Sequence, residues 1–476
     1  MKAVNAMDHD WDALSNLTEE TRAIALDYLS GLGDRPVGAR NTAYPETALP
    51  QQGVGAEGAL RLFQQAILPN LSASPGPRFW GYVIGGTNPA ALLGDWLVSA
   101  IDQNASINGD SIASALTART LDMLGELFRL PMGPSGFAGS FTAGAMGANH
   151  LAALTFRAWA GERLGVDVDA DGMAGLGGVA IFSASPHITM IKALGLSGFG
   201  RKSVIPVATH PGREAMDPAA LDRALAADPS RVKVVIASLG IVTTGDSEDI
   251  AAIATIAKRH DAWLHVDGAF GLFARTSPRF DALSNGVELA DSITSDGHKW
   301  LNVPYDCGFY FTRRLDLLEK AAVMAAPYLA TQDPAPIFCN RTLESSQRFR
   351  ALPVWMTLTA YGREGVAALV ERCCDLAARF AQGIEASDGL SLLAPQGLNI
   401  VAFRADFDGN ADDATRQRDF LTAINATGEV FLTPGRFAGK AGIRAAFSNW
   451  MTKEEDVDRV LDTIRRIRAE FGRDLS

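Results

Sequence analysis

The chain has 476 residues, of which 47% are hydrophobic and 20% are charged, and its formal net charge is −11. This length and hydrophobic content are typical of a globular protein with two or three subdomains. No window clusters Lys and Arg as a phosphate backbone requires, so a nucleic-acid partner is not expected.

Signals for membranes, secretion and metal binding are weak along the whole sequence. No run approaches the roughly 20 apolar residues that span a bilayer, and the first ten residues lack the apolar core of a secretory signal. The cysteines have neither metal-ligand spacing nor the density of a disulfide framework. We therefore expect a cytoplasmic protein with reduced thiols, no metal and no membrane contact. The cysteines are Cys307, Cys339, Cys373 and Cys374.

The first part of the chain is expected to be an arm. From about residue 16 to 70, helical patterns flank a stretch that is punctuated by Pro and Gly. Such a segment could not fold compactly alone. We expect an N-terminal helical arm over residues 1–85.

The middle of the chain alternates helical patterns with short apolar runs at 179–182, 232–237, 263–266 and 292–294. This alternation predicts an α/β domain with a mostly parallel sheet, over residues 86–350. Further on, long helical patterns at 355–385, 412–425 and 453–472 surround apolar runs at 398–403 and 443–447. They predict a smaller α+β C-terminal domain, over residues 351–476.

Three segments have residue types that suit a pyridine cofactor with a phosphate. The turn of small residues at 141–149 leads into a helical run, and such a turn presents backbone N–H groups to a phosphate. Taken alone, the segment is better explained by a tightly packed Gly/Ala helix start. In the 263–270 segment, an apolar strand delivers Asp267 just before Ala269. A carboxylate there would keep a pyridine nitrogen protonated, and Ala269 leaves room for the flat ring.

The third segment, residues 290–300, ends in a His-Lys pair followed by apolar residues. A lysine amine becomes nucleophilic when burial or nearby positive charge favours its neutral form. Lys299 is therefore the candidate for imine formation with a cofactor.

Taken in order, these segments resemble the group II pyridoxal-phosphate amino-acid decarboxylases, the family of aromatic amino acid, glutamate and diaminobutyrate decarboxylases. The resemblance covers almost the whole chain. It implies a fold-type I α/β enzyme with a mostly parallel seven-stranded sheet, and a homodimer in which the arm wraps the partner. The matching segments are 77–86, 141–149, 185–196, 265–271, 295–309 and 348–355.

The resemblance also implies roles for individual residues. Lys299 binds the cofactor, Asp267 tunes its ring, His187 stacks on the ring and Ala269 lies against it. Tyr82 and Val83 line the side-chain pocket, while Gln103 and Ala105 are among the residues that reach across the dimer interface. The phosphate is expected to be held by Thr142, Ala143, Ala145, Met146, Ser295 and His298.

The chain departs from the family pattern at several places. Met146 stands where Ser or Thr is usual, Ile241 replaces a threonine and Gly297 replaces a proline. Phe338 falls where many relatives have a tyrosine that returns a proton to Cα, in a lid predicted at 328–345. A phenylalanine cannot donate a proton, so this step would need another group. The alternative is that Phe338 is merely a residue of the lid.

Decarboxylation of an L-amino acid to its amine is the expected activity, with an aromatic substrate favoured by the apolar pocket. Phe338 keeps open an oxygen-dependent conversion to an aldehyde, as in plant relatives with phenylalanine at this place. Transamination is a weaker alternative. A further alternative is a cofactor-binding protein with little turnover.

Overall fold

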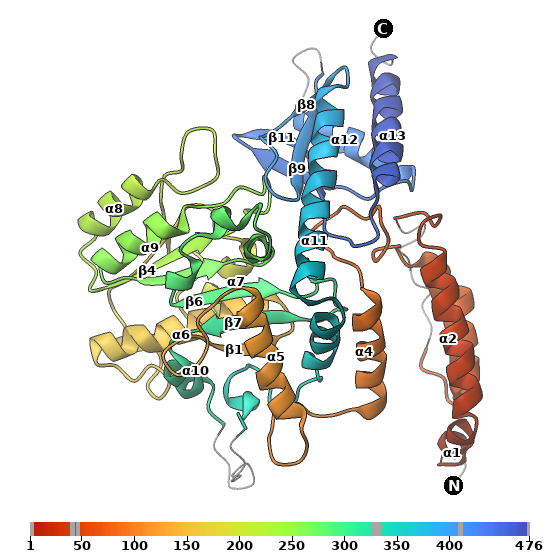
Figure 1. The fold of residues 1–476 in the computed structure, drawn as a ribbon, viewed down its shortest axis with the longest axis horizontal. Helices are drawn as coiled ribbons and strands as arrows, with labels where there is room; N and C mark the ends of the chain where they lie inside the picture. Colours follow the sequence, from red (N-terminus) through yellow and green to blue (C-terminus); the bar gives the residue numbers. More distant parts are fainter. Residues whose placement is uncertain (1–3, 39–42, 44–47, 325–334, 408–412, 474–476) are drawn as a thin grey trace.

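The computed structural model describes residues 4–38, 43, 48–324, 335–407 and 413–473 (Figure 1). Its centre is a seven-stranded sheet in the order β1-β7-β6-β5-β4-β2-β3. Strand β7 is antiparallel to both neighbours, and the other pairs are parallel, which confirms the predicted sheet. The strands are β1 (Ala138–Thr142), β2 (Val179–Ser183), β3 (Val204–Pro206), β4 (Val232–Ser238), β5 (Trp263–Asp267), β6 (Ser292–Asp296) and β7 (Gly308–Thr312).

Helices cover both faces of this sheet, and β5, β6 and β7 are buried at every position. Strands that are covered on both faces read as short apolar or β-branched runs, and such runs revealed β5 and β6, whereas β7 was not predicted. On one face, Ile181 and Val234 pack against α6, α7 and α10; on the other, Phe182 and Val235 pack among side chains of α5, α8 and α9. These helices are α5 (Ala113–Leu127), α6 (Ala145–Leu164), α7 (Ile188–Leu196), α8 (Pro218–Ala227), α9 (Ile250–Arg259) and α10 (Leu315–Ala322).

The C-terminal domain has a four-stranded antiparallel sheet in the order β10-β11-β9-β8. Helix α11 links the two sheets: it packs against α4 and α5 near the large sheet, and against β8, β9 and α13 in the small domain (Figure 1). The elements are α11 (Ala351–Glu385), β8 (Leu390–Leu392), β9 (Ile400–Ala405), α12 (Asp413–Ala426), β10 (Thr433–Phe437), β11 (Lys440–Ala446) and α13 (Glu454–Arg473).

The arm consists of α1 (Val4–Asp12), α2 (Leu14–Ser30) and α3 (Gly55–Leu62), and α2 stands apart from the body in Figure 1. No residue of α2 is buried. After the arm, the chain around Trp80 runs beside the C-terminal domain. The Trp80 N–H donates to the Phe431 carbonyl, and the Ala446 N–H donates to the Trp80 carbonyl. Helix α4 (Pro89–Ile101) follows and packs against α11. The predicted boundaries at residues 85 and 350 stay predictions.

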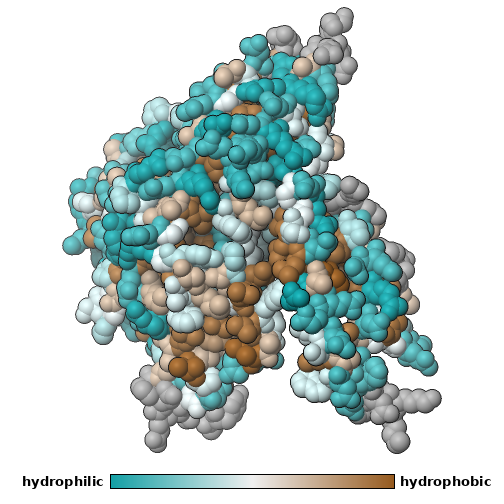
Figure 2. Space-filling view, turned by 45° about the vertical axis from the view of Figure 1, so that its right-hand side comes forward, coloured by the Kyte–Doolittle hydropathy of each residue, from teal (hydrophilic) through white to brown (hydrophobic). Residues whose placement is uncertain are grey.

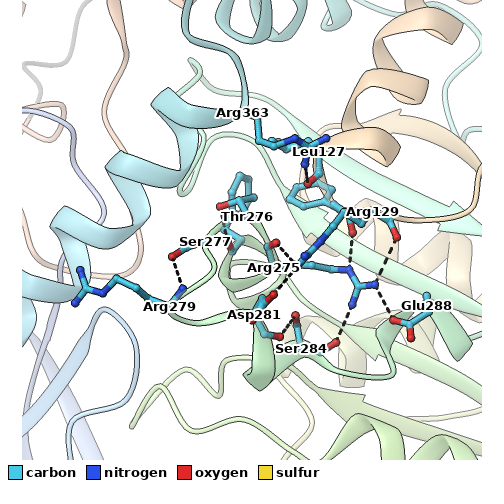
Figure 3. Close-up of polar contacts among 12 residues, drawn as sticks. Leu127, Arg129, Arg275, Thr276, Ser277, Arg279, Asp281, Ser284, Glu288 and Arg363 are labelled. Carbon is cyan, nitrogen blue, oxygen red and sulfur yellow. Dashed lines mark hydrogen bonds and ion pairs between the residues drawn. The ribbon is translucent and has the colours of Figure 1, made fainter.

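Two arginines satisfy the carbonyl groups at the end of α5 (Figure 3). Arg363 of α11 donates to the Leu127 carbonyl at 2.8 Å, and Arg275 donates to the Phe128 carbonyl at 2.6 Å. Arg275 also pairs with Glu288 at 2.7 Å. Positive groups are favourable at a helix C-terminus. These contacts therefore hold the end of α5 against α11 and against the segment that follows β5.

None of the helices in the described ranges is long and apolar enough to cross a membrane.

Candidate active site

The carboxyl ends of β4, β5 and β6 meet at one edge of the large sheet, where Ser238 is opposite Asp267 and Asp267 is opposite Thr294. Ligands of parallel α/β sheets bind at this edge. A cavity of about 330 Å³ opens there. Predicted site residues that line it are Val83, His187, Asp267, Ala269 and Lys299.

Asp267 ends β5 and is held by two donors. Asn149 Nδ2 of α6 donates to one carboxylate oxygen at 3.0 Å, and the Ala269 N–H donates to the other at 3.2 Å. Both contacts stabilise the ionised carboxylate at the cavity wall. Asp267 can therefore present a fixed negative charge to a ring nitrogen.

A chain of buried polar groups orients Asn149 in turn. Trp263 Nε1 donates to Ser292 Oγ at 3.1 Å, and Ser292 Oγ lies 2.9 Å from His265 Nδ1. The other ring nitrogen, His265 Nε2, lies 3.2 Å from Asn149 Oδ1. Burial lowers the pKa of His265 to about 4, so the ring is neutral, and Asn149 Oδ1 as acceptor assigns its proton to Nε2. Because Asn149 Oδ1 accepts from His265, the amide nitrogen Nδ2 points to Asp267 and donates to it.

Lys299 follows β6, and its Nζ lies 3.0 Å from a carboxylate oxygen of Asp296. The other oxygen of Asp296 accepts the Ala145 N–H, at the start of α6, at 2.6 Å. Asp296 is buried, with 1% of its surface exposed. The same carboxylate thus fixes both the lysine nitrogen and the first turn of α6.

The turn after Lys299 depends on two other residues. Asn302 has a left-handed backbone with φ of 57°, and its Nδ2 donates to the Trp300 carbonyl at 2.9 Å. A Cβ at Gly85 would collide with the Lys299 carbonyl oxygen. Gly85 therefore lets the 77–86 segment lie against this turn.

His187 caps the N-terminus of α7, and its Nδ1 lies 2.8 Å from Thr189 Oγ1. Burial lowers the pKa of His187 and outweighs the nearby carboxylate of Asp267, which raises it. A neutral imidazole at the cavity wall can cover a flat ring without adding charge.

Arg444 of β11 places the C-terminal domain beside the cavity, because it bonds the carbonyl of Val242, which lines the cavity. Arg444 is 4% exposed. Its guanidinium donates to the Val242 carbonyl, and also to the Tyr82 carbonyl at 2.6 Å. Its third nitrogen is buried with no hydrogen-bond partner among the described residues. Burial lowers the pKa of Arg444 to about 10, and its charge acts on His187. This cation can attract a carboxylate.

The predicted phosphate residues are only partly brought together. Thr142 uses its hydroxyl on a backbone carbonyl two residues on, and the Ala145 N–H is taken by Asp296. Ala143 is exposed and Met146 is half-buried. They surround the start of α6, where backbone N–H groups fit a phosphate, but none of them lines the cavity.

Ser295 and His298 have different surroundings. Ser292 and Asp296 contact the α6 side, so strand alternation places Ser295 on the opposite face of the sheet, and its hydroxyl has no partner among the described residues. His298 accepts the Cys307 N–H at 3.2 Å and stacks on Tyr305, with ring centroids 4.4 Å apart. A Cβ at Gly144 would lie 2.9 Å from His298, so this ring adjoins the α6 turn.

Residues present in the cavity fit the ring of pyridoxal phosphate: a fixed carboxylate, a neutral imidazole, a small residue and a lysine line one space. The phosphate fit rests on the start of α6 with His298 beside it. The predicted phosphate roles of Thr142, Ala143, Ala145, Met146, Ser295 and His298 stay predictions.

The predicted substrate residues are spread over two regions. Val83 lines the cavity, whereas the adjacent Tyr82 is 60% exposed and does not. Gln103 donates to the carbonyl at position 101, and the Ala105 N–H donates to the carbonyl at 347. Neither lines the cavity of its own chain, so their role across an interface stays a prediction.

Phe338 lies in a short 3₁₀ helix, Phe338–Asn340, and is 1% exposed. It packs in the core, with the Arg341 guanidinium 5.5 Å from its ring centre, and does not line the cavity. Its predicted catalytic place stays untested, because residues 325–334 of the predicted lid lie outside the described residues.

Asn149, Asp296 and Arg444 were missed as functional candidates. Asn149 lies one turn after Ala145, so helical spacing alone places both on one face of α6. Asp296, at the carboxyl end of a predicted strand, had a recognisable position. Arg444 had no local signal, because only the packing of the C-terminal domain brings it against Val242 in the cavity wall.

Comparison with known proteins agrees with this geometry. The model of the pyridoxal-dependent decarboxylase conserved domain matches residues 41–406. An aromatic-L-amino-acid decarboxylase of Sus scrofa is 28% identical, over 94% of each chain. An L-2,4-diaminobutyrate decarboxylase of Rhizobium meliloti (strain 1021) is 29% identical, over 89% of this chain and 84% of the relative.

A 4-hydroxyphenylacetaldehyde synthase of Rhodiola rosea is 26% identical, over 94% of each chain. The solved structure of Oryza sativa TDC with PLP and tryptamine has the same fold, with a TM-score of 0.89, 23% identity, and coverage of 97% of this chain and 98% of that one. The chain therefore belongs to the pyridoxal-dependent decarboxylase family, and it is an enzyme whose cofactor is pyridoxal phosphate.

Proposed function

We propose that this enzyme converts an L-amino acid with an aromatic side chain into the corresponding amine and carbon dioxide. The observation that carries the proposal is that Lys299 and Asp267 line one cavity, each with its charged group held by fixed partners. Pyridoxal phosphate supplies a ring that takes up the electrons left on Cα when carbon dioxide departs.

The residues of the chain have distinct tasks. Lys299 binds the cofactor through Nζ, and Asp267 holds a proton on the ring nitrogen. His187 covers the cavity wall and helps to exclude water. Arg444, with one unpartnered nitrogen, attracts the substrate carboxylate towards the wall formed by Val242.

The cavity favours an aromatic substrate. Val83, Ile241 and Phe270 give it apolar walls, and Lys299 is the only Lys or Arg that lines it in the described part of the chain. A second substrate carboxylate, as in glutamate, would find no lining cation once Lys299 is engaged. The similarity to the pig aromatic-L-amino-acid decarboxylase supports the same substrate class.

The second candidate is oxygen-dependent conversion to an aldehyde. Its support is the prediction that Phe338 falls at the place of the family's tyrosine, together with the similarity to the Rhodiola rosea aldehyde synthase. In that reaction an amino acid, oxygen and water yield the aldehyde, carbon dioxide, ammonia and hydrogen peroxide. Decarboxylation to the amine consumes no oxygen, which separates the two.

We also propose that the enzyme acts as a homodimer in the cytoplasm. Large apolar side chains are exposed along α4, and α2 has no buried residue, as expected of surfaces that a second copy covers. The four cysteines are free and buried, which suits a reducing compartment.

The experiment measures absorbance and products together. Wild type and Lys299→Ala are loaded with pyridoxal phosphate and given a panel of L-amino acids, with amine, carbon dioxide, ammonia and peroxide assayed. We expect a visible band that Lys299→Ala lacks, and amine from an aromatic substrate. Lys320→Ala is the control, since that lysine pairs with Asp167 on the surface.

Ammonia and peroxide in place of amine would favour the aldehyde-forming reaction. Amine from a non-aromatic substrate alone would contradict the proposed substrate class. A band without any product would contradict both proposed reactions.

A further inference from the structure

Asp296 has two contacts that no phosphate or substrate role explains. Its carboxylate is 3.0 Å from Lys299 Nζ through one oxygen and 2.6 Å from the Ala145 N–H through the other. His298 Nε2 lies further away, at 3.8 Å. Because the start of α6 holds the carboxylate independently, its position does not depend on Lys299.

Apart from Asp296, the titratable groups around Lys299 are either uncharged or paired with other residues. Asp296 is therefore the counter-charge of Lys299. Burial lowers the pKa of His187 and of His298, and it raises the pKa of Cys307 well above its usual range. Burial, followed by the charge of Asp296, raises the pKa of Tyr305 to about 12. These four side chains are therefore uncharged near neutral pH.

The remaining charged or titratable groups near the site have other partners. Glu214, which also lines the cavity, accepts a hydrogen bond from Thr244 at 2.7 Å, and burial raises its pKa. Asp267 is held by Asn149, and Asp306 pairs with Arg350 at 2.8 Å. Arg444 donates to backbone carbonyls. Among the described residues, Asp296 is the one carboxylate in ion-pair contact with Lys299.

We propose that Asp296 is a positioning residue that keeps a proton on the Lys299 nitrogen, including after this nitrogen has been linked to the cofactor. An opposite charge within about 4–6 Å favours the charged form of a group by roughly 1–3 pH units. A protonated link is more electrophilic, so it is readier to exchange the lysine for the amino group of a substrate. The proposal rests on the cofactor and not on the identity of the substrate.

The test is a pH titration of the loaded enzyme without substrate. Lysine-bound cofactor absorbs at a longer wavelength when the linking nitrogen carries a proton than when it does not. Wild type and Asp296→Asn are titrated from about pH 5 to 10. We expect the midpoint of the spectral change to fall by about 1–3 pH units in Asp296→Asn.

The asparagine variant separates charge from shape, since its amide oxygen can still accept the Ala145 N–H. Asp296→Glu keeps the charge and should keep a midpoint near that of wild type. Asp306→Asn removes a neighbouring negative charge that acts on His298 but has no contact with Lys299. Its midpoint should stay within a few tenths of a unit.

Equal midpoints in wild type and Asp296→Asn would overturn the proposal and leave Asp296 as a cap of α6 alone. If Asp296→Asn fails to fold or load, the nitrogen-15 resonance of Lys299 in loaded wild type decides. A protonated nitrogen at pH 8 is expected, and an unprotonated one would overturn the proposal.

Discussion

Asp267 acts through its charge and through the groups that orient it, and the two contributions can be separated. Asp267→Asn removes the charge that keeps the ring nitrogen protonated, and we expect kcat to fall about 10²- to 10³-fold, as when one stabilising group is lost. Steady-state kinetics of the loaded enzyme, with cofactor content measured by absorbance, provides the test.

Asn149→Ala is the matched comparison for Asp267→Asn. It removes one hydrogen bond to a charged group, a contact worth roughly 1.5–3 kcal/mol, but leaves the carboxylate in place. We expect a smaller fall in kcat, on the order of tenfold. Equal losses in both variants would contradict the separate role of the Asp267 charge.

His265 makes stability depend on pH. Burial lowers its pKa from 6.5 to about 4, so below pH 6.5 the unfolded chain takes up a proton that the folded chain refuses. Stability is therefore lost as the pH falls through this window, by about 2 kcal/mol at pH 5. Thermal unfolding of wild type at pH 7 and pH 5 measures the loss.

His265→Gln should show a smaller difference between the two pH values, because glutamine does not titrate. His9→Gln serves as the control, since the His9 side chain is exposed. The idea fails if His265→Gln loses as much stability on acidification as wild type does.

At the scale of secondary-structure elements, the C-terminus of α5 is held by side chains from elsewhere (Figure 3). Arg275→Gln would leave the Phe128 carbonyl and Glu288 without their cation. We expect the free energy of unfolding to fall by about 3 kcal/mol, measured by urea denaturation. Arg279→Gln, which breaks an exposed pair with Asp375, should change stability little. Similar losses in both variants would contradict a special role for the α5 end.

Strand β11 contributes to the active site from the other domain through Arg444. Arg444→Lys cannot bond two carbonyls and still keep an unpartnered nitrogen, so we expect KM for the amino acid to rise about tenfold with cofactor still bound. Arg436→Lys on the neighbouring strand β10 is the control, because Arg436 is exposed. An unchanged KM in Arg444→Lys would remove Arg444 from the site.

At the scale of the whole molecule, apolar side chains gather on the face beside the arm, where Figure 1 shows α4 (Figure 2). If this face joins two copies, a charge placed in it should separate them. Leu97→Asp should raise the dimer dissociation constant about a hundredfold, since burying a leucine is worth roughly 1.5–3 kcal/mol. Analytical ultracentrifugation measures the effect. The exposed large apolar residues of α4 are Leu93, Trp96, Leu97 and Ile101.

Leu289→Asp is the control for this substitution, because Leu289 is also exposed but lies outside α4. A wild-type protein that stays monomeric at micromolar concentration would contradict the proposed homodimer.

The sequence by itself determined the architecture and the two main site residues. Strands β2, β4, β5 and β6 were predicted from short runs rich in apolar and β-branched residues that alternate with helical patterns. Strand β3 was missed because it is short, β1 because it opens with small residues, and β7 because it lies within a motif segment. Asp267 was found because it ends an apolar strand just before Ala269, and Lys299 because it ends a His-Lys pair that apolar residues follow.

Only the tertiary structure decided how these residues are held. Asn149 and His265 act on Asp267 through contacts between α6 and β5. Arg444 reaches Val242 in the cavity wall from a strand more than 140 residues beyond Lys299. Phe338, singled out by alignment, packs in the core. Local sequence patterns specify strands and helices, but hydrogen bonds between distant segments depend on packing, which local patterns do not encode.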